Sequence, residues 1–275
     1  MISPPYTHLD IVTTRRGVTE LRRRWEAVDP WASLLIIHGL GEHSGRHHLV
    51  GARLAAAGID TRAFDLEGFG GSGGNRADQT VWSFYLDQIM DNLASLFHQN
   101  LPVVVLGHSM GGLLALDYAL SRHRQPDLLV LNAPATDAVV PAWKRKYGPI
   151  LAQVLPTLNL SNPFDLYQIF KDPAVAADYI KDPLSQSRTT VRLGTHMLGA
   201  MKRVNSSLHR FTTPCLLTHG EDDTLIPPYM SLKLGQLPNV ERRVYQRIRH
   251  ASLQEREGGV IVEDIVAWIR DRVGL

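Results

Sequence analysis

The sequence predicts an α/β domain built on a mostly parallel β-sheet with helices on both faces. Two observations carry this prediction. Short apolar, β-branched segments alternate along the chain with segments whose apolar residues recur every three to four positions, as they do in a helix. Several of the strand segments are also apolar at every position, as strands buried on both faces of a parallel sheet are. A length of 275 residues and a hydrophobic content of 44% fit one large domain.

The bulk properties exclude several classes of partner and site. The formal net charge is only +2, which gives no electrostatic signature of nucleic-acid binding. Cys215 is the only cysteine, so an intrachain disulfide and a multi-cysteine metal site are excluded, and a reducing compartment fits. Residues 1–6 do not resemble a secretory leader, and no window reaches the ~18 apolar residues of a membrane span. We expect a cytoplasmic protein, with peripheral membrane association left open.

The N-terminal segment predicts a β-hairpin followed by a central strand. A turn signal at residues 15–17 precedes residues 18–25, in which apolar and charged positions mix. We interpret the three arginines at 22–24 as solvated side chains of an edge strand, because charges commonly protect sheet edges. Residues 32–37 are apolar on both faces and predict the first central parallel strand.

Two glycine-rich loops follow, and each offers an alternative that we weigh and set aside. The first, residues 38–46, lies among four histidines, at positions 38, 43, 47 and 48. A metal site needs converging ligands, whereas the first two lie on a glycine loop and the last two point apart at a helix start. The second, residues 68–74, contains G-x-G-x-x-G after the strand 60–65 but does not open directly into an apolar helix. We therefore expect a flexible loop there, not a dinucleotide site.

The strongest motif is Gly107-His108-Ser109-Met110-Gly111, a G-x-S-x-G pentapeptide. It directly follows the apolar run 103–106 and directly precedes the helix-compatible run 113–116. A strand, a sharp turn and a helix form the setting in which a serine hydroxyl is held out as a nucleophile. An ordinary serine in a glycine-rich turn is the alternative, and the flanking strand and helix disfavour it. Ser109 is therefore the candidate nucleophile.

The alternation of strands and helices continues and is then interrupted once. A surface helix is predicted over residues 80–98 and a strand over 128–131, but no clear strand occurs between 137 and 210. Because seventy residues are too many for a loop in a compact domain, this stretch should form its own helices and act as a lid. The expected organisation is a core of residues 1–136 and 211–275 with a helical lid at 137–210. The sheet resumes with strands at 215–218 and 244–248, and the last helix runs through residues 261–269.

A serine nucleophile needs a base to take its proton and an acid group to orient that base. His250 follows the strand 244–248, and Asp223 follows the strand 215–218. Both would therefore emerge at the same sheet edge as Ser109, in the chain order Ser, Asp, His. Asp222 remains an alternative to Asp223, and a surface histidine in an arginine-rich loop remains the alternative for His250.

Taken together, these motifs resemble the α/β-hydrolases, and in particular the monoacylglycerol lipases with their lysophospholipase-like relatives. The loop from His38 to Arg46 is similar to the HGxGEHxxRY stretch of that family, and residues 107–112 read GHSMGG as its elbow does. Asp223 stands in its GxxD position, and residues 249–255 resemble its catalytic-histidine loop. The resemblance covers about residues 30–270. It departs at His47, which replaces a tyrosine, and at residues 65–70, which replace DxRGHG.

The resemblance implies an α/β-hydrolase fold, with a mostly parallel eight-stranded sheet flanked by helices and a helical lid inserted after strand 6. It also implies acyl transfer through an acyl-serine, without a metal or an organic cofactor. Ser109, Asp223 and His250 would be the catalytic residues. The backbone N–H groups of Leu40 and Met110 would form the oxyanion hole, as the elbow geometry also suggests.

The implied substrate is a lipid monoester, cleaved into a fatty acid and glycerol. A carboxylesterase or lysophospholipase acting on other single-chain esters is the rival interpretation, and a non-enzymatic binding protein of the same fold is the third. Glu42 and Arg46 would lie near the alcohol, although both could equally hold the loop in place. Residues 139–143 are apolar and are followed by three cations at 144–146, which predicts membrane contact through the lid. Packing of Trp143 inside the lid is the alternative, and the sequence indicates no oligomeric state.

Overall fold

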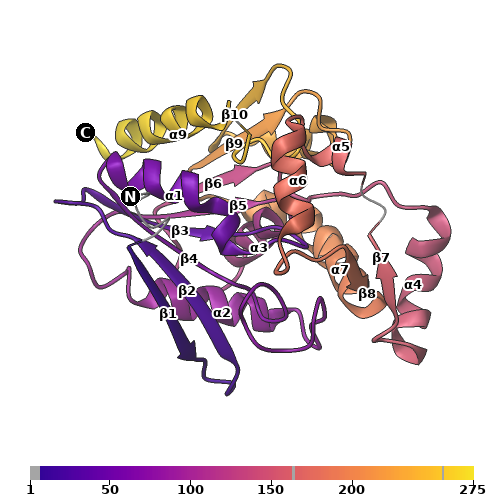
Figure 1. Cartoon of the computed structure of the whole chain (residues 1–275). Helices are drawn as coiled ribbons and strands as arrows, with labels where there is room; N and C mark the ends of the chain where they lie inside the picture. Colours follow the sequence, from indigo (N-terminus) through magenta and orange to yellow (C-terminus); the bar gives the residue numbers. More distant parts are fainter. Residues whose placement is uncertain (1–6, 163–164, 256) are drawn as a thin grey trace.

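The computed structural model describes residues 7–162, 165–255 and 257–275. An eight-stranded sheet in the order β1-β2-β4-β3-β5-β6-β9-β10 forms its centre (Figure 1). The pairs from β4 to β10 are parallel, and β2 runs antiparallel to both of its neighbours. The mostly parallel sheet predicted from the sequence is thus confirmed. The strands are β1 (His8–Thr13), β2 (Thr19–Trp25), β3 (Ala32–Ile37), β4 (Ile59–Phe64), β5 (Val103–His108), β6 (Leu128–Asn132), β9 (Cys215–Gly220) and β10 (Val240–Tyr245).

Helices cover both faces of this sheet. Figure 1 shows α1 (His48–Ala56) and α9 (Gly258–Val273) on one face, and α2 (Ser83–Ala94) and α3 (Met110–Ala119) on the other. Because successive side chains of a strand point to opposite faces, Leu34 of β3 packs into the core beneath α1 and α9, whereas Leu35 packs into the core with α2 and α3. The expectation that the central strands are buried on both faces is confirmed, since all six residues of β3 are buried. The shorter elements are α8 (Leu232–Gly235) and the 3₁₀ helices η1 (Ser44–His47), η2 (Leu208–Arg210) and η3 (Pro228–Ser231).

The stretch between β6 and β9, which we call the insertion (residues 137–210), lies at one end of the sheet (Figure 1). It contains α4 (Ala142–Val154), α5 (Leu166–Ile169), α6 (Pro173–Lys181) and α7 (Val191–Ser207). It also contains two short antiparallel strands that sequence analysis missed, β7 (Asn159–Ser161) and β8 (Arg188–Thr190). Strands of three residues are too short to show an alternating pattern.

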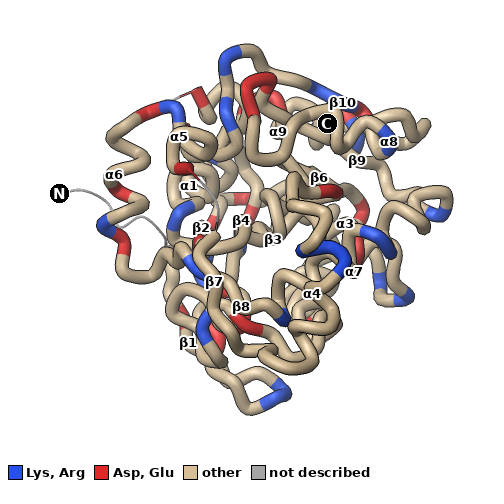
Figure 2. The backbone as a smooth tube through the Cα atoms, turned by 90° about the vertical axis from the view of Figure 1, so that its right-hand side faces the viewer, with Lys and Arg blue, Asp and Glu red and all other residues tan. Residues whose placement is uncertain are grey.

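Acidic and basic residues are interspersed around the insertion and are not segregated by sign, as Figure 2 shows in a view onto this end of the molecule. This distribution matches the small net charge of the sequence. Among the helices that the structure describes, none combines the length and the apolar character needed to cross a bilayer.

The interpretation of β2 as an edge strand with solvated arginines is wrong. β2 lies between β1 and β4, and β1 takes the edge position. Leu21, Arg23 and Trp25 alternate onto one face of β2, and that face is buried. Arg23 is only 7% exposed, and its guanidinium forms an ion pair with Asp65 at 3.0 Å. A charged residue is tolerated there because the buried carboxylate neutralises it.

Two further expectations need correction. The strand expected at 244–248 is β10, which begins at Val240 and ends at Tyr245. Its charged residues, at 241–243, concealed its start in the sequence. The loop at 68–74 is packed against the domain, whereas a flexible loop was expected: Phe69 is fully buried, and the Gly71 N–H donates to Asp65 Oδ2 at 2.7 Å.

Candidate active site

Ser109 occupies a sharp turn between β5 and α3. Its backbone has φ 53° and ψ −116°, a conformation that L-residues rarely adopt and that is typical of strained functional positions. The flanking glycines are required by close approach. A Cβ at Gly107 would collide with the carbonyl of Gly111, and a Cβ at Gly111 would collide with the carbonyl of Ile37. The turn therefore holds Ser109 at the carboxyl end of β5, where its side chain lines a cavity.

Asp223 and His250 meet at this edge of the sheet. His250 Nδ1 lies 2.7 Å from Asp223 Oδ2, and Asp223 Oδ1 accepts hydrogen bonds from the backbone N–H groups of Leu225 and Ile226 at 3.0 and 2.8 Å. Burial alone would raise the pKa of Asp223, but the neighbouring His250 and the hydrogen bonds outweigh burial and hold that pKa well below its usual value. The alternative acid, Asp222, is exposed, whereas Asp223 is buried. Of the two neighbouring aspartates, Asp223 is the one in contact with His250.

Ser109 and His250 line the same cavity. Within the described residues they form no direct hydrogen bond, which is common for catalytic contacts before substrate is bound. The ring centres of His250 and His108 lie 5.0 Å apart, and His108 Nδ1 is 2.8 Å from Asn132 Oδ1. Burial lowers the pKa of His108 to about 4, so this ring is neutral at pH 7 and adds no charge beside His250.

The loop that carries Leu40 is oriented by a buried histidine. His38 Nε2 accepts the Leu66 N–H at 3.0 Å, so its Nδ1 carries the proton and donates to the carbonyl of Gly39 at 2.8 Å. Burial lowers the pKa of His38 to about 4, which keeps the ring neutral. In a trans peptide the N–H points opposite to the C=O, so the Leu40 N–H points away from His38. Leu40 lines the cavity, and Met110 begins α3, where helix N–H groups lack intrahelical partners.

Glu42 and Arg46 are placed differently. Glu42 lines the cavity, where its Oε1 accepts the Gly39 N–H at 2.6 Å and its Oε2 accepts from Gln254 Nε2 at 2.5 Å. Burial opposes its ionisation, but nearby His47 holds the pKa of Glu42 well below its usual value. Arg46 is not among the described residues that line the cavity. Its guanidinium lies 5.1 Å from the ring centre of Tyr179 and 3.8 Å from Asp182, both in the insertion.

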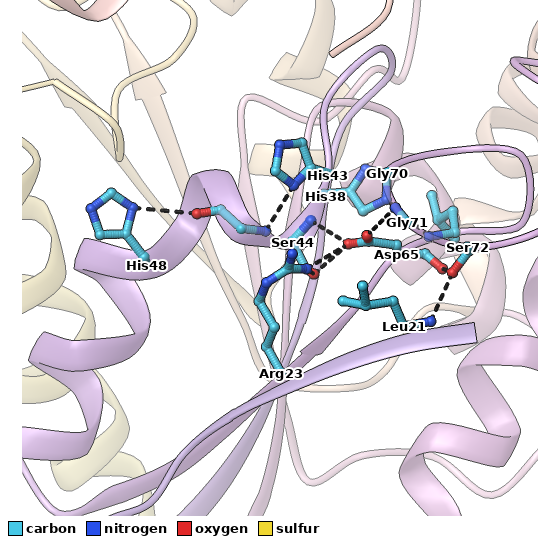
Figure 3. Close-up of polar contacts among 12 residues, drawn as sticks. Leu21, Arg23, His38, His43, Ser44, His48, Asp65, Gly70, Gly71 and Ser72 are labelled. Atoms are coloured by element: carbon cyan, nitrogen blue, oxygen red, sulfur yellow. Dashed lines mark hydrogen bonds and ion pairs between the residues drawn. The ribbon is translucent and has the colours of Figure 1, made fainter. Parts of the chain in front are cut away.

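A buried ionic network holds Ser44, which lies in the loop from residue 38 to residue 46 (Figure 3). The Asp65 carboxylate accepts hydrogen bonds from the Ser44 N–H at 2.8 Å, from Arg23 at 3.0 Å and from the Gly71 N–H at 2.7 Å, and it also contacts the Ser44 hydroxyl. Burial opposes ionisation, but the positive charge of Arg23 and the hydrogen bonds from Ser44 and the Gly71 N–H hold the pKa of Asp65 below its usual value. Sequence analysis missed this role. The available signal was a carboxylate directly after the strand β4 and before a glycine-rich loop.

The cavity has a volume of about 430 Å³, within the usual range for small-molecule sites. Ser109, His250 and Glu42 are among its polar lining residues. Its apolar walls come largely from two elements of the insertion: Val140, Trp143 and Leu151 from α4 and the segment before it, and Met197, Leu198 and Met201 from α7. A cavity whose lining is mostly apolar, beside a strained serine, suits an ester with a hydrocarbon chain.

The insertion is fixed to the loops of the site at several points. The carbonyl of Gly41 accepts hydrogen bonds from the Gln186 N–H at 2.7 Å and from the Tyr179 hydroxyl at 3.0 Å. His43 Nε2 lies 2.7 Å from Asp182 Oδ2. By contrast, none of the thirteen residues of α4 is buried, and Trp143 is 55% exposed.

Comparison with known proteins places these features in a family. A family model described as Hydrolase_4, serine aminopeptidase S33, matches residues 28–257. A monoacylglycerol lipase of Mycolicibacterium smegmatis is 30% identical over 250 residues, which span 88% of this chain and 89% of that protein. The human monoglyceride lipase is 29% identical over 283 residues, or 98% of this chain and 93% of that protein. An abhydrolase domain-containing protein of Dictyostelium discoideum is 31% identical over 96% of this chain, which spans only 29% of that protein's length.

Solved structures agree with the sequence relatives. The crystal structure of the Paleococcus ferrophilus monoacylglycerol lipase has a TM-score of 0.81 at 27% identity and covers 91% of this chain and 98% of that one. A variant of the Saccharomyces cerevisiae monoglyceride lipase, solved with a substrate analogue, has a TM-score of 0.86 at 21% identity over 99% of this chain and 97% of that one. At that identity the yeast structure establishes the shared fold alone.

Proposed function

The chain belongs to the serine aminopeptidase S33 family of α/β-hydrolases, and from this premise we propose that it hydrolyses monoacylglycerols to a fatty acid and glycerol. The observation that carries the proposal is the strained Ser109 beside the hydrogen-bonded pair of Asp223 and His250 in an apolar cavity. Relatives named as monoacylglycerol or monoglyceride lipases support the choice of substrate.

In the proposed reaction, His250 takes the proton of Ser109 as the serine oxygen attacks the ester carbonyl. Asp223 holds the imidazole by its Nδ1 and stabilises the positive charge that develops there. The backbone N–H groups of Leu40 and Met110 stabilise the oxyanion. His250 then returns the proton to the leaving alcohol, which leaves the acyl group bound to Ser109. In the second half of the reaction, His250 takes a proton from a water molecule as the water attacks the acyl carbonyl, and it returns that proton to Ser109 as the fatty acid leaves.

Residues 137–210 act as a lid over a core of residues 1–136 and 211–275. The acyl chain would lie between α4 and α7, whose apolar side chains line the cavity. Glu42 would face the glycerol hydroxyls, because it is the carboxylate in the cavity nearest to the oxyanion loop. Arg46 acts on the loop and the insertion, as its contacts with Tyr179 and Asp182 indicate.

The exposed start of α4 and the segment before it support peripheral contact with a membrane. Val139 and Trp143 are 66% and 55% exposed, and the Lys144 ammonium lies 5.7 Å from the ring centre of Trp143. Apolar side chains beside cations suit the boundary between headgroups and acyl chains. A single-chain lipid would enter the cavity beside Val139 and Trp143, which both line it.

The decisive experiment combines labelling with a substrate panel. A fluorophosphonate probe should label the wild-type protein at Ser109, and Ser109→Ala should abolish labelling and reduce turnover by about 10⁴- to 10⁶-fold. The panel contains monoacylglycerols, p-nitrophenyl esters, lysophospholipids and an aminoacyl p-nitroanilide. Preference for monoacylglycerols supports the proposal. Absence of labelling would indicate a binding protein, and preference for the anilide would indicate an aminopeptidase.

A further inference from the structure

One face of α7 forms a wall of the cavity. Val191, Leu198 and Met201 line it, and their spacing of three and seven residues keeps them on the same side of the helix. Gly194 lies on this face, is half-buried and also lines the cavity. At this position, therefore, the wall is formed by backbone where the pattern of the helix calls for an apolar side chain.

The backbone gives no reason for a glycine at position 194. The residue lies inside a helix of 17 residues, and it is not among the described glycines with positive φ. A Cβ built there meets no heavy atom within 4 Å, in contrast to Gly107 and Gly111, where it would collide with backbone. Glycine weakens a helix interior relative to alanine because it loses more backbone entropy. Its effect at position 194 is therefore to leave open space.

That space lies where α4 faces α7. Gly148 of α4 also lines the cavity, and a Cβ there would lie 3.5 Å from Thr195 Oγ1, in ordinary contact. The two helices thus approach closely beside Gly194, and Leu151 of α4 continues the opposite wall. A side chain at position 194 would occupy the space between these walls.

We propose that Gly194 determines the length of acyl chain that the cavity accepts. Because Gly194 has no side chain, a long hydrocarbon can pass between α4 and α7, whereas a larger residue would close this part of the cavity and leave the polar part near Ser109 intact. This inference rests on the proposed ester hydrolysis and adds to it a residue that determines specificity.

The test compares two substitutions in the same helix. Gly199 is exposed, is not among the described residues that line the cavity, and would also accept a Cβ without a contact within 4 Å. Gly194→Leu and Gly199→Leu should both raise Tm, because leucine is the better helix former. Gly194→Leu should reduce kcat/KM for palmitoyl esters by about 10- to 200-fold relative to butyryl esters. Gly199→Leu should leave the chain-length profile of the wild type unchanged, and Gly194→Ala should give an intermediate profile.

A second measurement does not depend on catalysis. In the Ser109→Ala background, displacement of a fluorescent fatty acid by butyrate, octanoate and palmitate reports how the cavity accepts chain length. Gly194→Leu should weaken displacement by palmitate and spare octanoate. An unchanged profile in both measurements overturns the inference and leaves the proposed function standing, as does an equal loss for all chain lengths in a folded variant. If the wild type hydrolyses no ester, the proposed function fails, and the displacement profile still decides the role of Gly194.

Discussion

The carboxyl edge of the sheet and the rim formed by α4 are built in opposite ways. At the edge, several polar side chains are buried and held by specific partners, as in the contact of His250 with Asp223 and that of Glu42 with the Gly39 N–H. At the rim, Trp143 and Ile150 are more than half exposed, and α4 has no buried residue. Chemistry needs fixed geometry, whereas uptake of an apolar chain needs exposed apolar area. Changes at the edge should therefore affect every ester, and changes at the rim only long-chain ones.

The insertion itself belongs partly to each region. Its segment after α5 is bonded to the catalytic loops: the buried Glu255 carboxylate accepts the N–H groups of Lys171 and Asp172, and the Tyr179 hydroxyl donates to the carbonyl of Gly41. Burial raises the pKa of Glu255 above its usual value, because these two hydrogen bonds do not fully offset desolvation. The insertion thus has a base that is hydrogen-bonded to the loops of the site and an exposed helix, α4, that has no buried residue.

The largest expected effect within this comparison concerns the acid of the edge. Asp223→Asn should reduce kcat by about 10⁴-fold for short and long esters alike, because an amide no longer fixes the imidazole in the required tautomer. Asp222→Asn is the matched control, since its carboxylate is exposed, and it should keep most activity. Steady-state kinetics of both variants provides the measurement. The reverse result would move the acid by one position.

The second effect concerns the free energy of unfolding and the buried ion pair of Arg23 with Asp65. Arg23→Met removes one partner of a buried ion pair and should lower the free energy of unfolding by about 3–5 kcal/mol, since Asp65 is left as an uncompensated buried charge. Arg145→Met breaks an exposed pair with Asp137 on the rim and should cost less than about 1 kcal/mol. Urea unfolding measures both. Equal losses would mean that the Arg23 pair adds nothing beyond a surface pair.

The ion pair of Arg23 with Asp65 also predicts a pH dependence of stability. The pKa of Asp65 is lower in the folded protein than its usual value, so its contribution to stability is complete above the unfolded pKa of about 3.9. That contribution is lost as the pH falls below this value through the folded pKa. Arg23→Met should therefore weaken the acid dependence of unfolding in this window, whereas Arg145→Met should retain it.

The site residues that could be predicted from the sequence are those that follow a recognisable strand. Ser109, Asp223 and His250 each follow a strand, and parallel strands deliver their ends to one edge, so the structure brings them to neighbouring positions. Arg23 could not be placed in the same way, because a charged residue in a strand shows its burial only when the neighbours β1 and β4 are known. The attachment of Gly41 to Gln186 joins residues far apart in the sequence and has no local signature.

The fourth prediction concerns the oxyanion loop, which lies between the edge and the insertion. Leu40→Pro removes the backbone N–H assigned to the oxyanion and should reduce kcat by about 10²- to 10³-fold for all esters. Leu40→Ala keeps that N–H and is the matched control, with most turnover retained. Circular dichroism checks that both variants fold. Unchanged turnover in a folded Leu40→Pro protein would show that the second donor lies elsewhere.

The smallest effect concerns the rim and tests the comparison most directly. Val140→Ser combined with Trp143→Ser removes apolar area at the cavity entrance and should weaken binding to anionic vesicles and turnover of long-chain monoacylglycerols on the order of tenfold. Hydrolysis of p-nitrophenyl butyrate should change by less than about twofold, because a short soluble ester needs no membrane. Ile180→Ser is the control: it is 68% exposed on α6, in the part of the insertion that is bonded to the edge, and should alter neither property. Equal losses for both esters in the double variant would mean that the cavity itself was damaged, and the division into a catalytic edge and an interfacial rim would then be wrong.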